Sequence, residues 1–182
     1  MPEESWWNPP KYQDNEEWKA DDKWHRVTFE PDAYYDYSKL LDFAKQRYEE
    51  TRSTFDKLDA KCEALIRFTS AMAAALFAIL KFLKLPLEWP GISAYFCFLV
   101  AIILSFRILK PAKIGSPVSG RQALDSVPKL GSNEIQASMA SSYHCAATAT
   151  SVVNRWKALQ LMRGHGWMIL GLVLMFVGLF LG

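Results

Sequence analysis

The chain has 182 residues, 51% of them hydrophobic, and a net charge of +2, yet its mean hydropathy is only −0.02. The apolar residues must therefore be concentrated in particular segments, which suits one ordinary domain or a small domain with membrane segments. Basic residues flank these segments instead of gathering on one soluble face, and this argues against nucleic-acid binding.

The cysteines argue against a disulfide framework and a zinc site, and the N-terminus argues against a secretory signal. Cys62, Cys97 and Cys145 contain no short-spaced pair, which argues against a disulfide framework and against a zinc site. We expect buried thiols in a reducing compartment and no metal or cofactor. The first residues are acidic and aromatic, so they do not form a cleavable secretory signal.

Residues 1–33 form an acidic tail with a net charge of −5, whereas residues 34–182 carry +7. The tail is rich in tryptophan and tyrosine, and because disordered tails are poor in aromatics we expect it to dock on something. Three interpretations stay open: it covers its own chain or a neighbouring protomer, it binds a protein activator, or it binds a signalling nucleotide. The residues expected to make such contacts are Trp18, Trp24, Arg26 and Tyr35.

Residues 34–66 are predicted to form an amphipathic helix with an apolar seam at alternating steps of three and four. The seam continues in register into the next apolar segment. Its members are Leu41, Ala44, Tyr48, Thr51, Phe55, Leu58, Cys62, Leu65, Thr69, Met72, Leu76 and Ile79. An isolated helix would not leave such a seam uncovered, so another helix is expected to pack on it.

Three runs lack charged residues: residues 68–80, 91–106 and 166–182. Each is somewhat shorter than the ~20 residues of a typical span, which leaves buried soluble helices as an alternative. All three are bounded by Lys, Arg or Trp, and this favours membrane spans. Residues 67–110 then form a two-span hairpin with an outer loop at about 81–90, and residues 164–182 form the third span.

The distribution of Lys and Arg predicts the orientation. Residues 107–163 contain eight bases and two acids, whereas the loop near residues 81–90 contains only Lys81, Lys84 and Glu88. The positive-inside bias therefore places the N-terminus and residues 111–163 in the cytoplasm and the C-terminus on the opposite face of the inner (plasma) membrane.

Within residues 111–163, a Gly-, Pro- and Ser-rich loop precedes a helix expected from about residue 134 to 163. Its seam has the same steps but smaller residues: Ile135, Met139, Ser142, Ala146, Ala149, Val153 and Trp156. Small residues here suit packing against the bulky first seam. Gly164 and Gly166 follow, and they either bend the helix or let it continue. The residues expected to pack the stalk or an oligomer are Tyr48, Phe55, Leu58, Met139, Val153 and Trp156.

The predicted fold is an all-α membrane protein with three transmembrane helices, a cytoplasmic two-helix, coiled-coil-like stalk and an aromatic N-terminal tail. Gly171, Gly178 and Gly182 are expected to permit close packing of the spans. Small and hydroxylic residues either pack one bundle or line a path between protomers, and the residues for such a pore are Thr69, Ser70 and Ser105. We expect no enzymatic activity, because neither the histidines nor the adjacent His144 and Cys145 form a catalytic or metal-binding pattern.

Several of these features together resemble a group of small bacterial membrane proteins. They are Asp59 and Lys61 ahead of the first span, Arg107 with Lys110 and Pro111 after the second, and Asn154 with Lys157 before the last. In this arrangement the chain is similar to SLATT-type and Pycsar-type transmembrane effectors of antiphage defence over residues 50–110 and 150–182. It departs from them at Cys62, where alanine is usual, and in the aromatic tail.

The resemblance implies a membrane effector that is triggered by a nucleotide or a protein partner, forms a homo-oligomer and disrupts or permeabilises the inner membrane. The alternative is a non-catalytic accessory or structural subunit of a larger membrane complex. Both functions require exposed surfaces for assembly, so the sequence leaves them open.

Overall fold

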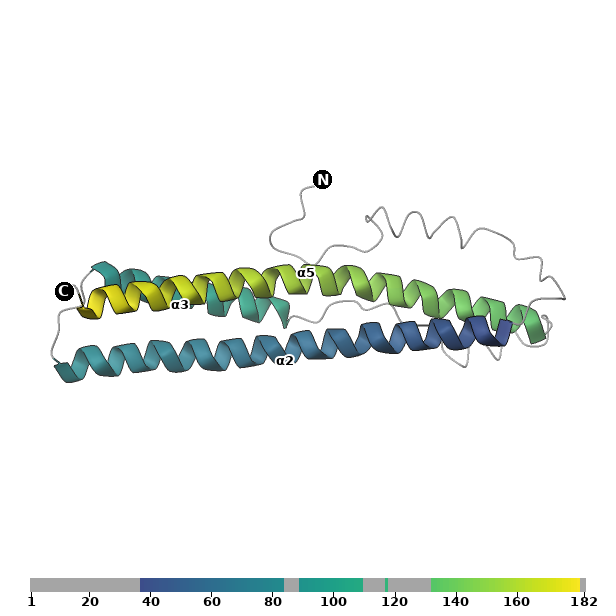
Figure 1. The fold of residues 1–182 in the computed structure, drawn as a ribbon, viewed down its shortest axis with the longest axis horizontal. Coiled ribbons are helices and arrows are strands. Elements are labelled where there is room, and N and C mark those ends of the chain that lie inside the picture. The colour runs from purple at the N-terminus through teal and green to yellow at the C-terminus, as the bar shows by residue number, and fades with distance from the viewer. Residues whose placement is uncertain (1–36, 84–88, 110–116, 118–131, 181–182) are drawn as a thin grey trace, which may run out of the picture. The chain divides into compact units, whose positions relative to one another are not determined.

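The computed structural model describes residues 37–83, 89–109, 117 and 132–180. These contain three helices and no strand: α2 (Tyr37–Leu83), α3 (Trp89–Ile108) and α5 (Ser132–Phe180), shown in Figure 1. All three are long and apolar enough to cross a membrane, which confirms the all-α prediction with three candidate spans. The expected contacts at Trp18, Trp24, Arg26 and Tyr35, and Gly182, lie outside the described residues.

Both long helices are continuous. α2 has 47 residues without a glycine or proline, so no residue in it favours a break. α5 has 49 residues and passes through Gly164 and Gly166 without interruption, so of the two alternatives for this stretch the helix continues. α3 carries Pro90 at its second position, where the missing N–H would have no partner within the helix.

The described residues fall into two compact units, to each of which both α2 and α5 contribute. In unit 1, residues 37–56 of α2 pack on residues 132–156 of α5. Leu41 and Ala44 meet Ala140, and further along both helices Tyr48 meets Ala146 and Ala147. Because residue numbers rise together on the two helices, these segments run parallel.

Unit 2 contains residues 57–83 of α2, all of α3 and residues 157–180 of α5. One core cluster joins Cys62, Leu65 and Leu161 to Ile108 at the end of α3. A second joins Leu76, Met175 and Phe98, which lies earlier in α3. α3 is therefore antiparallel to the other two helices, in an up-down-up three-helix bundle.

The seam predicted for α2 is buried or half-buried from Leu41 to Leu76. The prediction is wrong at Ile79, which is 37% exposed. Ala73 and Leu80 instead pack on the second core cluster of unit 2. A strict heptad seam suits one partner helix, but here α2 meets two, so the buried face widens and shifts. Every residue of the predicted α5 seam is buried or half-buried, and residues 146–150 are buried on all sides.

Candidate functional site: an ion pair and a groove between α2 and α5

The most unusual buried group is Lys157 of α5, in unit 2. Its side chain is only 1% exposed, and Nζ donates a hydrogen bond to Oδ1 of Asp59 on α2, whose side chain is 30% exposed. Burying an ammonium group costs on the order of several kcal/mol of hydration free energy. Attraction to a nearby carboxylate can offset this cost. Asp59 therefore offsets part of the cost of burying Lys157 between the helices.

Cys62 lies one turn beyond Asp59 and is completely buried. Burial raises the pKa of the Cys62 thiol to about 11, with a further increase from Asp59 and a smaller opposing effect from Lys157. The thiol is therefore protonated at neutral pH and a poor nucleophile. It fills space in the cluster with Leu65, Leu161 and Ile108.

A groove of about 680 Å³ adjoins this cluster in unit 2. On α2 its lining consists of Leu58, Lys61, Ala64, Leu65 and Phe68, and on α5 of Ala158, Leu161, Met162, His165 and Met168. Eight of these ten side chains are apolar. Because Ala64 and Ala158 end at Cβ, they leave the space between the helices unfilled.

Two polar side chains line the groove, one from each helix. Lys61 is exposed and forms no ion pair with the described residues. His165 is exposed, and its Nδ1 lies 2.9 Å from the carbonyl oxygen of Leu161, to which it donates, so Nε2 is the nitrogen left for a ligand. The groove is thus amphipathic, with an apolar lining and polar groups at the side chains of Lys61 and His165.

Unit 1 has its own polar contact between the helices. Asn154 is buried and donates from Nδ2 to the carbonyl oxygen of Thr51 at 2.9 Å, while its Oδ1 has no partner among the described residues. Nearby, Arg47 Nη1 lies 3.1 Å from His144 Nδ1. Cys145 donates instead to Ser141 of its own helix, at 2.8 Å. These contacts of the adjacent His144 and Cys145 are thus to different groups.

The residues predicted to pack the stalk or an oligomer are packed inside one chain. The rings of Tyr48 and Tyr143 meet edge to face with centroids 5.7 Å apart. Met139 packs on the cluster of Leu41, Ala44 and Ala140, and Leu58 packs on the cluster around Cys62 in unit 2. The remaining three are buried: Phe55, Val153 and Trp156.

Two of the glycines predicted to pack the spans lie against α3. A Cβ added at Gly171 would come within 2.7 Å of the Phe98 ring, and one added at Gly178 would lie 3.1 Å from the Pro90 side chain. These glycines therefore permit close approach of α5 and α3 within one chain.

The three residues proposed for a pore are not grouped. Thr69 and Ser105 are fully buried, and each donates its hydroxyl hydrogen to a carbonyl four residues earlier, on Leu65 and Ala101 respectively. Only Ser70 is exposed. In this arrangement Thr69 and Ser105 do not line an open path, because helix packing has covered them.

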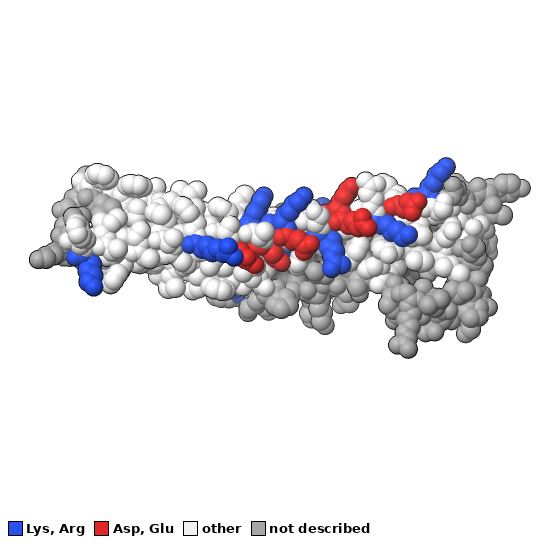
Figure 2. All heavy atoms as spheres, turned by 90° about the horizontal axis from the view of Figure 1, so that it is seen from below, with Lys and Arg blue, Asp and Glu red and all other residues white. Residues whose placement is uncertain are grey.

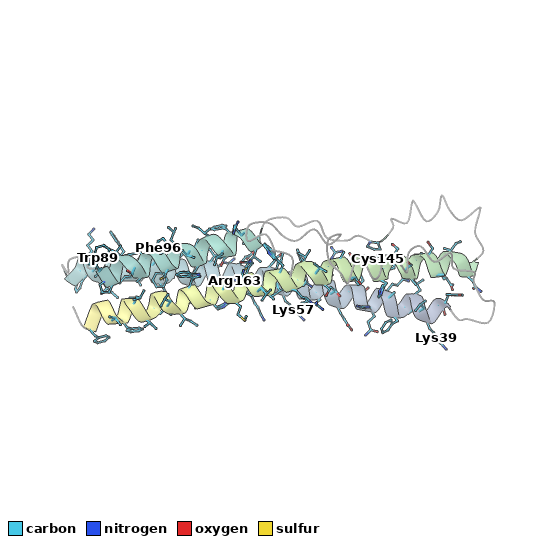
Figure 3. The ribbon with its side chains drawn as sticks, turned by 90° about the horizontal axis from the view of Figure 1, so that it is seen from above. Lys39, Lys57, Trp89, Phe96, Cys145 and Arg163 are labelled. Carbon is cyan, nitrogen blue, oxygen red and sulfur yellow. The ribbon has the colours of Figure 1, made fainter. Side chains whose placement is uncertain are left out.

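Apolar side chains cover the outside of unit 2. Phe96 on α3, labelled in Figure 3, is 60% exposed. Between Arg67 and Lys81, α2 has no charged residue, and Figure 2 shows charges of both signs on one stretch of the molecular surface and an uncharged stretch beside it. Other large exposed apolar side chains are Phe77, Phe82, Leu99, Ile103, Phe106, Ile169, Val173 and Phe176.

The described residues hold no group of three or more His, Cys, Asp or Glu side chains that could bind a metal ion. No protein-family model matches the chain, and no curated protein and no solved structure shows significant similarity to it. The features that bear on function are therefore the ion pair, the groove and the apolar surface. Neither the pairing of Asp59 with Lys157 nor the groove was predicted from the sequence.

Proposed function

We propose that the protein is a three-span protein of the bacterial inner membrane, with the N-terminus and unit 1 in the cytoplasm and the C-terminus on the opposite face. The observation that carries this proposal is the exposed apolar surface of unit 2. At most 39% of the residues in the most apolar part of any of the three helices are buried within the chain. Exposing such an apolar surface to water would cost free energy. Lipid tails or further copies of the chain would cover it.

The proposed activity is that of a defence-type effector, which forms a homo-oligomer and permeabilises the membrane when a nucleotide or protein activates it. Its support is the similarity to SLATT-type and Pycsar-type effectors and the position of the residues that carry it. Two of them, Asp59 and Lys157, form the buried ion pair, and a third, Asn154, holds α5 to α2 in unit 1. Such contacts suit a resting state that activation can rearrange.

Permeabilisation by this protein requires its helices to move. Thr69 and Ser105 are buried between helices of one bundle, so water reaches them only if those helices separate. The proposed mechanism is therefore assembly followed by rearrangement of the spans, with the contacts to lipid exchanged for contacts between copies. A channel already open through one chain is not part of the proposal.

Controlled expression in bacteria tests this function. Induction of the full chain with its activator, or its overexpression, is expected to depolarise the cells within minutes and to stop growth, as followed with a potential-sensitive dye. The matched control carries charged residues in the third span, for example Leu172→Arg with Leu174→Arg, which prevents insertion of α5. Harmless expression, together with purification only as part of a larger complex, would instead identify an accessory subunit.

A further inference from the structure

The groove between α2 and α5 in unit 2 has no role in the proposed function so far. Its volume of about 680 Å³ lies within the ~300–1,000 Å³ that small-molecule sites occupy. An apolar lining with a cationic side chain on one helix is the arrangement that an amphipathic anion fits. We infer that this groove binds one anionic phospholipid of the cytoplasmic leaflet, with an acyl chain along the apolar residues and the phosphate at Lys61.

The depth of the groove relative to the bilayer favours a lipid. This step rests on the proposed membrane topology. A span of ~20 residues that ends at Leu83 begins near Ala64, which is in the middle of the α2 side of the groove. Lys61 lies three residues before Ala64, or about 4.5 Å along the helix toward the cytoplasm. It is therefore at the level of the headgroups. Phe68 and Met168 lie on the hydrocarbon side of that level.

The charge of this end of unit 2 favours an anionic headgroup. Residues 57–67, Arg107 and residues 157–163 have a formal charge of +4. The carboxylates among them are already engaged, because Asp59 pairs with Lys157 and Glu63 lies 3.3 Å from Arg67. Basic residues close to a membrane surface each contribute about 1 kcal/mol toward anionic lipid. A phosphate at Lys61 is therefore attracted by a net positive surface and repelled by no unpaired carboxylate on the α2 side of the groove.

The apolar lining of the groove favours an acyl chain as the other part of the ligand. Leu65, Phe68, Met162 and Met168 offer a flexible, unbranched chain an apolar surface on the hydrocarbon side of Lys61. Ala64 and Ala158 provide the space. A free phosphate would gain nothing from this lining, whereas a phospholipid uses both parts of the groove.

Native mass spectrometry of the delipidated full-length protein in mild detergent tests the inference. The probes are phosphatidylglycerol and phosphatidylcholine with identical acyl chains. We expect one phosphatidylglycerol per protomer, bound more tightly than phosphatidylcholine. Lys61→Gln should weaken phosphatidylglycerol binding about fivefold, equivalent to about 1 kcal/mol, and leave phosphatidylcholine unchanged.

Two further variants provide the controls. Lys57→Gln removes an exposed lysine one turn earlier that does not line the groove, so it should weaken phosphatidylglycerol binding clearly less than Lys61→Gln does and leave phosphatidylcholine binding unchanged. Ala158→Phe fills the groove and should reduce binding of both lipids. Equal binding of the two lipids, or an equal effect of Lys57→Gln and Lys61→Gln, would overturn the inference.

Three further outcomes distinguish a wrong occupant of the groove from a failure of the proposed membrane function. If the protein is a dimer and Ala158→Phe makes it monomeric without affecting lipid binding, the groove holds a second copy of the chain and the inference is wrong. If the protein is soluble without detergent, the membrane function itself fails before any lipid is tested. A membrane-integral, depolarising protein without lipid preference would refute only the lipid site.

Discussion

Gly171 of α5 lies directly against the ring of Phe98 on α3, so close that a Cβ added at the glycine would come within 2.7 Å of the ring. Phe98 is only 1% exposed and packs with Leu76, Ala94 and Met175. The ring therefore has no free space into which it can move. The absence of a side chain at residue 171 is what permits α3 and α5 to pack around this phenylalanine.

Gly171→Ala should destabilise the bundle by about 1–3 kcal/mol, because overpacking at a buried contact forces side chains or helices apart. Gly166→Ala is the matched control, since nothing lies within 4 Å of a Cβ added there. It should stabilise α5 by up to ~1 kcal/mol, the difference between alanine and glycine in a helix. Thermal unfolding in detergent, followed by circular dichroism, measures both. Equal midpoints for the two variants would contradict the packing at Phe98.

Asp59→Asn should cost about 3–5 kcal/mol, because it removes the carboxylate that pairs with the buried ammonium of Lys157. Lys157→Met should cost less, since Asp59 is 30% exposed and can reach water. The double variant Asp59→Asn/Lys157→Met is expected to be more stable than Asp59→Asn alone, because the buried ammonium is removed together with its carboxylate partner.

Glu63→Gln is the control for the loss of a carboxylate from α2. The Glu63–Arg67 pair is exposed, so its loss should change the stability by ~0.5 kcal/mol or less. The same unfolding experiment compares all four variants. An effect of Asp59→Asn no greater than that of Glu63→Gln would show that Lys157 is not held as a buried cation.

Cys62 should react with maleimide much more slowly than Cys145, because it is completely buried and its thiol is protonated at neutral pH. Mass spectrometry of the labelled protein distinguishes the two sites. Asp59→Asn should lower the pKa of the Cys62 thiol, since the carboxylate is one of the causes that raise it. Rapid labelling of Cys62 in the folded wild type would contradict its position in the core.

The raised pKa of the Cys62 thiol should make the free energy of unfolding depend on pH at alkaline pH. The folded pKa of Cys62 is raised from 9.0 to about 11, so the folded state binds the proton more tightly than the unfolded state. The stabilisation from the neutral thiol is therefore fully present below 9.0 and is lost as the pH rises through about 11. Over this range Cys62→Ala should lose less stability than the wild type, as measured by denaturation at a series of pH values.

Phe55→Asp should separate α2 from α5 in unit 1 and abolish assembly, while membrane insertion persists. Phe55 is 8% exposed, and replacing a buried phenylalanine by a charged residue costs at least ~3 kcal/mol. Ser53→Asp, on the exposed side of the same helix, is the control. Light scattering of the detergent complex gives the oligomer size, and carbonate extraction checks insertion. An oligomer that survives Phe55→Asp would remove this contact from the assembly.

The regular parts of the structure were accessible from sequence because periodicity reports burial directly. The α2 seam from Leu41 to Leu76 and the whole α5 seam are buried or half-buried. The exception, Ile79, was missed because a heptad pattern anticipates one partner helix, and here α3 provides a second. The burial of Thr69 and Ser105 was not predicted for a related reason, since a hydroxyl in an apolar span can donate to its own helix.

The pairing of Asp59 with Lys157 had a signal in the sequence that went unused. The two seams have the same steps, so Tyr48 aligns with Ala146 and Phe55 with Val153, each 98 residues later, and the same separation joins Asp59 to Lys157. Alignment of the seams in parallel register would have placed the carboxylate beside the ammonium. The groove has no comparable signal, because it depends on where alanines meet across two packed helices.

The hydroxyl bonds of Thr69 and Ser105 have a consequence for energetics. Each bond stays within its own helix, so it survives when a neighbouring helix moves away. Away from the Asp59–Lys157 pair, sliding or parting of the apolar segments then exchanges mainly dispersion contacts, whose strength depends on how well the surrounding acyl chains pack. The balance between conformations should accordingly follow bilayer thickness and fluidity, and growth temperature or fatty-acid saturation would shift it.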